Sequence, residues 1–175
     1  MACVRDNESA LEMPVAVDTA PLAQKRDILT YDHPEATQII TSVIKPEELV
    51  AFAQTLKGVP YQYASCDPGS GFDCSGFIYY VFGHFGITVP RSSADFTNLG
   101  YAVDRKAAKA GDLILFTGTD SSRKTVGHIG IVLSNERDSL LFIHSSSGSA
   151  HGVTTSPLDG YYAGRLMKII RVFSQ

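Results

Sequence analysis

The hydrophobic pattern of the chain changes its period once, near Asp112, and this change constrains the fold more than any other sequence feature. Before it, apolar residues recur at the three- and four-residue spacing of amphipathic helices. After it, they form short, partly β-branched runs bounded by Gly, Asn and Asp. Helices first and consecutive hairpin strands afterwards are typical of an α+β domain. We therefore expect N-terminal helices packed on a central antiparallel sheet.

Two helices and a shorter one are expected before the change of period. The first covers residues 46–57, with proline in its first turn and Gly58 at its end. The second runs from near Cys74 to Gly86 and carries a buried apolar face. A short helix over 92–98 begins with serine, a good N-cap. The expected strands cover residues 113–116, 129–133, 140–145 and 167–173.

The first 36 residues differ in character from the rest of the chain. They mix prolines with acidic and small residues and show no sustained period, so we expect a flexible tether at 1–36 and one folded domain at 37–175. The start Met1-Ala2-Cys3 resembles the end of a lipoprotein signal, in which the cysteine carries lipid. An ordinary surface cysteine is the alternative.

Charge and composition exclude several classes of function. The net charge is −3 and no Lys/Arg cluster occurs along the chain, which argues against nucleic acid as a partner. No apolar run approaches the roughly 20 residues that span a bilayer. Three cysteines without a CxxC pair are too few for a disulfide framework or a zinc site, so we expect no metal or cofactor.

Cys74 stands where a polar loop turns into the second helix. Unpaired backbone N–H groups at a helix start favour the thiolate, which is the nucleophilic form, and help to hold an oxyanion. A disulfide to Cys66 would block this thiol, so we predict that the two are not bridged. The alternative is a structural cysteine at a helix start.

A thiol nucleophile needs a base, and His128 begins a strand on which it shares a face with Gly130 and Val132. Gly130 leaves room beside the imidazole. The next strand returns antiparallel and brings back His144, which would orient the imidazole in a Cys-His-His triad. With an odd loop such as 134–138, the two histidines face each other directly; an even loop places them on opposite faces.

Six short motifs follow one another in the chain: Pro60-Tyr61, Phe72-Asp73-Cys74-Ser75-Gly76-Phe77, Val89-Pro90-Arg91-Ser92-Ser93, Gly111-Asp112-Leu113, Gly127-His128-Ile129-Gly130-Ile131 and Ile143-His144. Their order resembles the NlpC family of peptidoglycan cysteine peptidases over about residues 46–173. The resemblance implies a papain-like fold, a place in the bacterial cell envelope, and hydrolysis of amide bonds in wall stem peptides, usually between γ-D-glutamate and a diamino acid.

Roles follow from the resemblance position by position. Cys74 matches the nucleophile, His128 the base and His144 the third polar residue. The resemblance places substrate-binding positions at Tyr61, Asp73, Ser75 and Arg91.

Two departures from the family pattern suggest a reshaped substrate groove. Ala64-Ser65 replaces a usual glycine pair and is followed by a longer loop, and Phe96 replaces a usual glutamine. They motivate one alternative, a wall-peptide binding module without turnover. A second alternative keeps the thiol chemistry as an acyltransferase or amidase.

The remaining polar residues are expected to have lesser roles. His33, His84 and His151 are interpreted as surface residues, with His151 the best placed to reach a substrate. The serine-rich run 145–149 is expected to form a rim loop, and Asp112 a turn before the first strand.

Overall fold

The computed structural model describes residues 39, 41, 44–120, 122–136 and 139–173. The predicted tether, with Cys3 and His33, lies outside the described residues. Within the described part of the chain, no helix is long and apolar enough to cross a membrane.

Helix α1 (Pro46–Thr55) begins at the predicted proline and ends two residues before the predicted end. The side chain of Glu48 accepts a hydrogen bond of 2.8 Å from the backbone N–H of Lys45, which closes the first turn. Gly58 follows with a φ of +88°, the left-handed conformation that glycine adopts without steric cost. Leu49, Val50 and Ala53 form its buried face.

Helix α2 (Cys74–His84) begins at the predicted cysteine. Asp73 is its N-cap, because the carboxylate accepts a hydrogen bond of 2.6 Å from the backbone N–H of Gly76. A Cβ on Gly76 would collide with the carbonyl oxygen of Ser65, so glycine here lets the preceding loop lie directly against the helix start. The buried face of the helix contains Phe77, Ile78, Val81 and Phe82.

The third predicted helix is a 3-10 helix, η1 (Ser93–Asn98). Ser92 takes the N-cap position, but its side chain makes no capping hydrogen bond. A second short 3-10 helix, η2 (Arg105–Ala107), follows residues 101–103 and precedes residues 113–117, both of which are strands of the main sheet.

The main sheet is antiparallel and has the strand order β3-β8-β4-β5-β6-β7. Its central strands are those that the sequence predicts: β4 (Leu113–Thr117), β5 (Val126–Glu136), β6 (Ser139–Ser146) and β8 (Leu166–Arg171). The edge strands β3 (Tyr101–Val103) and β7 (Gly152–Pro157) were not predicted, because β3 has only three residues and β7 carries few apolar ones. A separate hairpin joins β1 (Cys66–Asp67) to β2 (Gly71–Phe72), and α3 (Gly160–Ala163) precedes β8.

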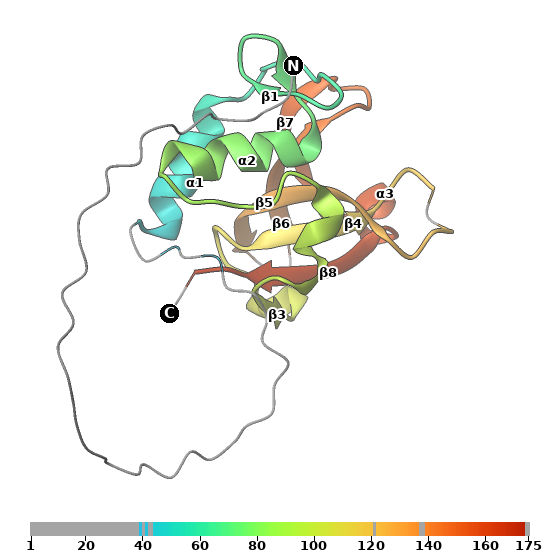
Figure 1. The fold of residues 1–175 in the computed structure, drawn as a ribbon. Coiled ribbons are helices and arrows are strands. Elements are labelled where there is room, and N and C mark those ends of the chain that lie inside the picture. The colour runs from blue at the N-terminus through green and yellow to red at the C-terminus, as the bar shows by residue number, and fades with distance from the viewer. Residues whose placement is uncertain (1–38, 40, 42–43, 121, 137–138, 174–175) are drawn as a thin grey trace, which may run out of the picture. The chain divides into compact units, whose positions relative to one another are not determined.

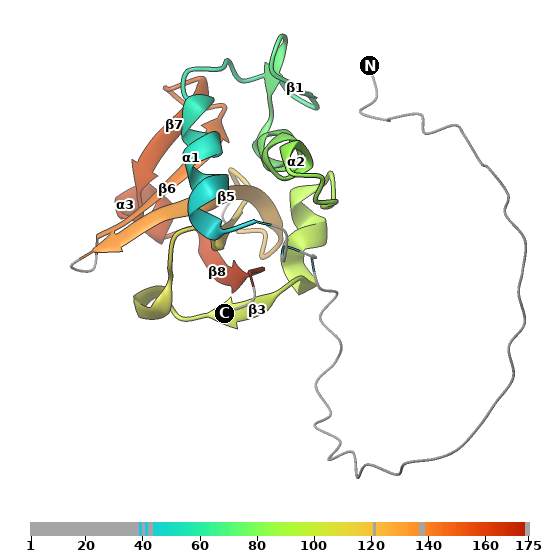
Figure 2. The same ribbon diagram turned by 90° about the vertical axis from the view of Figure 1, so that its left-hand side faces the viewer.

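The sheet has a hydrophobic core on each face. Helices α1 and α2 cover one face (Figures 1 and 2), where Leu115, Ile129 and Ile131 pack against them. The other face holds a smaller cluster that includes Phe116 and Phe142. The predicted α+β architecture is therefore confirmed, with the helices on one side of an antiparallel sheet.

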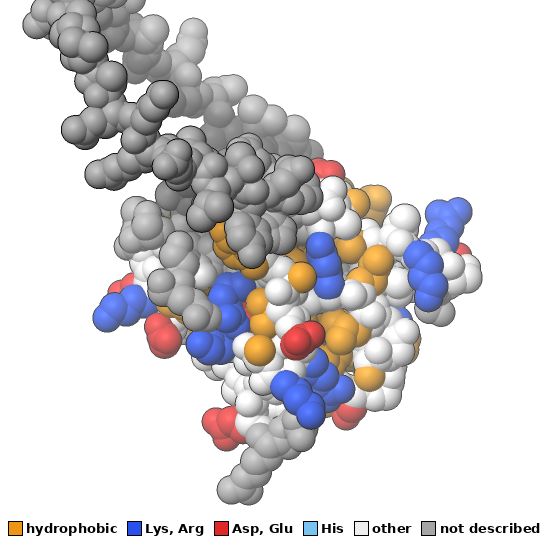
Figure 3. Space-filling view, turned by 90° about the horizontal axis from the view of Figure 1, so that it is seen from below, with side chains coloured by type: hydrophobic (Ala, Val, Ile, Leu, Met, Phe, Trp, Pro, Cys, Tyr) orange, Lys and Arg blue, Asp and Glu red, His pale blue; other side chains and the backbone are white. Residues whose placement is uncertain are grey.

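The surface around β3 and β8 mixes both signs of charge. Figure 3 shows Lys and Arg side chains interspersed with Asp and Glu and with hydrophobic side chains on this face. Interspersed charges of opposite sign largely cancel one another's field at a distance, so this face is not a basic surface of the kind that binds phosphate backbones.

The register of the β5–β6 hairpin differs from the prediction. β5 ends at Glu136 and β6 begins at Ser139, so the connection is even, which by itself would separate the histidines. The pairing shifts by one residue between Val132 and Ser134, and this bulge at Leu133 restores the parity. Ile131 pairs with Ile143, so His144 lies diagonally from His128 on the same face and not directly opposite it.

Candidate active site

The two histidines of the hairpin are in direct contact. His128 Nε2 and His144 Nδ1 lie 2.8 Å apart, within hydrogen-bond distance. Gly130 leaves room on β6, whereas the prediction places this room beside the His128 imidazole: a Cβ on Gly130 would lie 3.2 Å from His144 Cβ and 2.8 Å from Phe142 Cδ2. The bare backbone at this position therefore makes room for the His144 ring.

His144 is fully buried and has a further polar partner beyond His128. Its Nε2 lies 3.0 Å from Ser156 Oγ on β7, and the Tyr162 hydroxyl is 3.5 Å from the same nitrogen. The ring of Phe142 packs beside it at a centroid distance of 4.8 Å. These contacts leave His144 with one orientation, held from both sides.

Both imidazoles are held in their neutral forms. Burial, the neighbouring His144 and then Arg165 keep the pKa of His128 well below its ordinary value of 6.5. Burial and then Arg165 lower the pKa of His144 to about 4. A neutral His128 can accept a proton near pH 7, and a neutral His144 can accept a hydrogen bond from it.

Cys74 provides a free thiol at the start of α2, so the prediction that it is not bridged to Cys66 is confirmed. Burial, followed by the Asp73 carboxylate, raises the pKa of this thiol to about 11. Backbone N–H groups of Ser75, Ile129 and Cys74 itself act in the opposite direction. The N–H groups at the helix start therefore favour the thiolate as expected, but burial and the Asp73 charge outweigh them in the resting thiol.

A backbone N–H group of β5 lies next to the Cys74 sulfur, one residue from His128. The Ile129 N–H that acts on the Cys74 sulfur belongs to the residue after His128. Among the residues that the structure describes, no hydrogen bond joins Cys74 to His128 directly. The fold thus places the start of α2 beside the strand that carries His128.

Three of the four predicted substrate-binding residues form one network beside the thiol. Arg91 binds the Asp73 carboxylate with both arms, at 2.9 and 2.7 Å, and its Nη1 also donates to Ser75 Oγ at 3.0 Å. Asp73 additionally caps α2, so the same carboxylate joins the helix start to the arginine. The network is rigid and largely buried on the Asp73 side.

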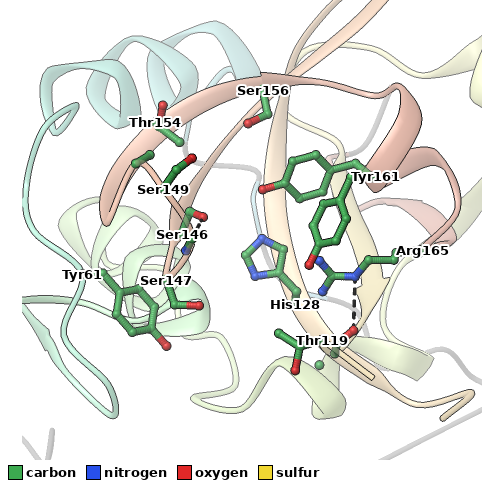
Figure 4. A pocket seen from close by; sticks show the side chains of 15 residues that line it. Tyr61, Thr119, His128, Ser146, Ser147, Ser149, Thr154, Ser156, Tyr161 and Arg165 are labelled. Atoms are coloured by element: carbon green, nitrogen blue, oxygen red, sulfur yellow. Dashed lines mark hydrogen bonds between the residues drawn. The ribbon is translucent and has the colours of Figure 1, made fainter. Parts of the chain in front are cut away.

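Tyr61, the fourth predicted substrate-binding residue, lines a cavity of about 770 Å³, and His128 lines the same cavity. In Figure 4, Tyr61 lies at one end of this cavity and Arg165 at the other, with His128 between them. Burial, and next the nearby Cys74 and Asp73, raise the pKa of Tyr61, so the thiol lies toward the Tyr61 end. A cavity of this size accommodates a peptide of a few residues.

In the serine-rich run 145–149, the first serine is buried and the other residues line the cavity. Ser145 is fully buried and donates a hydrogen bond of 2.7 Å to the Phe72 carbonyl oxygen, which ties β6 to the residues just before α2. Residues 146–149 line the cavity, as the predicted rim loop would. His151 and His84 are exposed, as expected; the His151 ring lies 5.9 Å from that of Tyr61.

The Phe96 side chain is fully buried in the hydrophobic core on the helix side of the sheet, and it is not among the residues that line the cavity. Its effect on the shape of the substrate groove stays a prediction. Asp112 precedes β4 in a turn, as predicted, where it accepts from the Lys109 N–H at 2.8 Å. It also forms a buried ion pair with Arg171 at 2.7 Å.

Ser156, Tyr162 and Arg165 complete the site but were not predicted. Ser156 stands on the polar edge strand β7, whose pattern carries no strong strand signal. Arg165 follows α3, a helix of one turn that no periodicity marks. Only the alternation Val-Thr-Thr-Ser after Gly152 could have suggested that Ser156 shares a sheet face with a β6 residue.

The donor set at this site suits thiol chemistry. Among the described residues, no group of three His, Cys, Asp or Glu side chains is arranged to hold a metal ion. The site contains the Cys74 thiol, the neutral imidazoles of His128 and His144, and the Asp73 carboxylate that caps α2. A thiol and imidazoles of this kind can transfer protons and form a covalent acyl bond.

Comparison with known proteins supports one family. The model of the NlpC/P60 family matches residues 58–171. The chain is 32% identical to the bifunctional muramidase/DL-endopeptidase CwlT of Bacillus subtilis over 72% of its length, and covers 36% of that protein. It is 28% identical to the murein DD-endopeptidase MepS/murein LD-carboxypeptidase of Escherichia coli strain K12, over 99% of the chain and 86% of that protein.

A solved structure shares the fold. A crystal structure of an NlpC/P60 family protein from Bacillus cereus matches with a TM-score of 0.65 and 29% identity, covering 74% of this chain and 41% of that one. The chain thus spans well under half the length of several of the proteins that it matches. Because the family model covers residues 58–171, which include Cys74, His128 and His144, the chain belongs to the NlpC/P60 family.

Proposed function

We propose that the chain is a cysteine endopeptidase that hydrolyses amide bonds in peptidoglycan stem peptides. The observation that carries the proposal is the contact of 2.8 Å between His128 Nε2 on β5 and His144 Nδ1 on β6. Strand β5 lies next to the start of α2, which carries Cys74. Relatives named as peptidoglycan endopeptidases support the substrate class.

The tautomers of the two histidines follow from their partners. With His128 Nε2–H donating to His144 Nδ1, His128 Nδ1 is free to accept the thiol proton. His144 then carries its own proton on Nε2 and donates it to Ser156 Oγ. The low pKa of His144 keeps it a hydrogen-bond acceptor when His128 becomes charged.

The reaction follows from these roles. His128 removes the Cys74 proton as the sulfur attacks the amide carbonyl, and backbone N–H groups at the start of α2 stabilise the oxyanion. His128 then gives its proton to the leaving amine, and a thioester remains on Cys74. Water, activated by His128, hydrolyses the thioester. Contacts between thiol and base are often long in resting enzymes and shorten when substrate binds.

The bond is proposed to lie between γ-D-glutamate and a diamino acid. A relative from Bacillus cereus that is 36% identical over 87 residues is named a gamma-D-glutamyl-L-lysine dipeptidyl-peptidase. A relative from Bacillus subtilis that is 27% identical over 129 residues carries the same name, whereas MepS is named for different bonds. For the binding-only alternative, only the Ala64-Ser65 departure lies on an exposed loop, whereas Phe96 is buried in the core and does not line the cavity. We also propose a place in the cell envelope, where this substrate occurs.

The test is digestion of purified peptidoglycan with mass spectrometry of the released fragments. Cys74→Ala and His128→Ala should each abolish release, while His84→Ala, which removes an exposed histidine far from the cavity, should retain it. Fragments released by Cys74→Ala at the rate of the unaltered protein would exclude thiol catalysis. Inhibition by a chelator would argue for a metal-dependent reaction instead.

A further inference from the structure

Arg165 is a buried cation that has no acidic partner among the described residues, and it lines the cavity that His128 also lines. Its exposed fraction is 8%. The ion pairs of the described residues involve Arg91, Arg123 and Arg171, and none includes Arg165. A buried guanidinium without a carboxylate is costly, because water no longer solvates the charge.

The contacts of Arg165 hold its guanidinium in one position. Its Nε donates to the Gly118 carbonyl at 3.1 Å and its Nη2 to the Thr117 carbonyl at 2.7 Å. The Tyr161 ring lies 4.6 Å from the guanidinium carbon and covers one face of the group. Within the described chain, Nη1 has no hydrogen-bond partner.

Figure 4 shows the guanidinium of Arg165, which follows α3 in the chain, pointing into the cavity toward His128. Its charge acts on both imidazoles, which places it beside the catalytic pair and not on a distant wall. The geometry is that of an anion site prepared in advance: a fixed cation, an Nη1 whose two N–H groups have no partner among the described residues, and a cavity in front of it.

The position along the cavity indicates which part of the substrate would meet Arg165. Cys74 lies toward the Tyr61 end, where the acyl part of the substrate must be attached. His128 delivers its proton to the leaving amine, so the leaving residue lies on the far side of His128, which is the Arg165 end.

We propose that Arg165 binds a carboxylate of the residue whose amine is released, so that the enzyme prefers substrates bearing a free carboxylate there. The proposal rests on the proposed function and adds to it a charge requirement on the leaving side of the bond. It also accounts for the missing acidic partner, because the substrate itself supplies the counter-charge.

The test uses two tripeptides, L-Ala-γ-D-Glu-L-Lys with a free carboxylate on lysine and the same peptide ending in a carboxamide. For the unaltered protein, kcat/KM should be about 10- to 100-fold higher with the carboxylate, as expected for losing one charge-assisted contact. Arg165→Gln should bring the ratio of the two values close to one. Arg165→Lys should retain part of the preference, because it keeps the charge without the planar fork.

Arg123→Gln is the matched control, since it removes an exposed arginine from the β4–β5 connection and should leave the preference intact. Equal rates on both peptides by the unaltered protein would overturn the proposal, whether or not the Arg165 variants fold. Cleavage of neither peptide, with intact peptidoglycan still digested, would overturn it together with the proposed γ-D-glutamyl bond. Loss of wall digestion as well would overturn the proposed function itself.

Discussion

Replacing Arg91 with alanine should weaken both the fold and the reactivity of Cys74. The substitution removes two charge-assisted hydrogen bonds to Asp73 and one hydrogen bond to Ser75. Asp73 is 8% exposed and would keep its charge without a partner. A fully buried pair broken in this way costs about 3 to 5 kcal/mol, but the Arg91 side chain is 33% exposed, so we expect about 2 kcal/mol.

The same change should act on the thiol through charge. Asp73 already raises the pKa of Cys74, and without Arg91 its negative charge is no longer balanced. The pKa of Cys74 should therefore rise further, and less thiolate should be present at a given pH. We expect alkylation of Cys74 by iodoacetamide at pH 8 to slow by about 3- to 10-fold, which corresponds to a shift of about half to one pKa unit.

Urea unfolding and the alkylation rate are measured on the same preparations. Arg123→Ala is the control, because its ion pair with Asp120 is 3.7 Å long and exposed, and it should change stability by less than about 0.5 kcal/mol. Arg91→Lys should restore the thiol rate more than the stability, since it keeps the charge and loses the two-armed contact. If Arg91→Ala matched the unaltered protein in both measurements, the network would not support the helix start.

Two further perturbations test the histidine pair. Gly130→Ala places a methyl group 2.9 Å from the Ile143 carbonyl oxygen and 3.2 Å from His144 Cβ. We therefore expect the variant to lose about 1 to 3 kcal/mol of stability and to digest peptidoglycan more slowly. Unfolding at an unchanged urea concentration would contradict the close packing of β5 on β6. Acidification should also destabilise the fold: the pKa of His144 is about 4 in the native protein and near 6.5 when unfolded, so the unfolded chain binds more protons between these values. The free energy of unfolding should fall by about 2 to 3 kcal/mol as the pH drops from 6.5 to 4, and His144→Gln should remove that share; equal slopes for both proteins would show that His144 does not titrate on unfolding.

Much of the fold could be predicted because local chemistry decides it. The proline before the first helix, Asp73 before the second and the alternating residues of β4 and β5 act on their neighbours in the chain, so their effect can be read from the sequence. The same holds for Gly130, whose missing side chain predicts a close neighbour. The family motifs supplied the roles of Cys74, His128 and His144.

What the tertiary structure decided depends on contacts between segments far apart in the chain. The bulge at Leu133 follows from fitting an even connection to a sheet that buries both strands, and it sets the diagonal contact of the histidines. The high pKa of Cys74 is a result of burial, which no helix-start argument includes. Arg165 stands between the one-turn helix α3 and β8, and neither has a sequence pattern that points to the cavity, so only the assembled fold could show that this cation lines it.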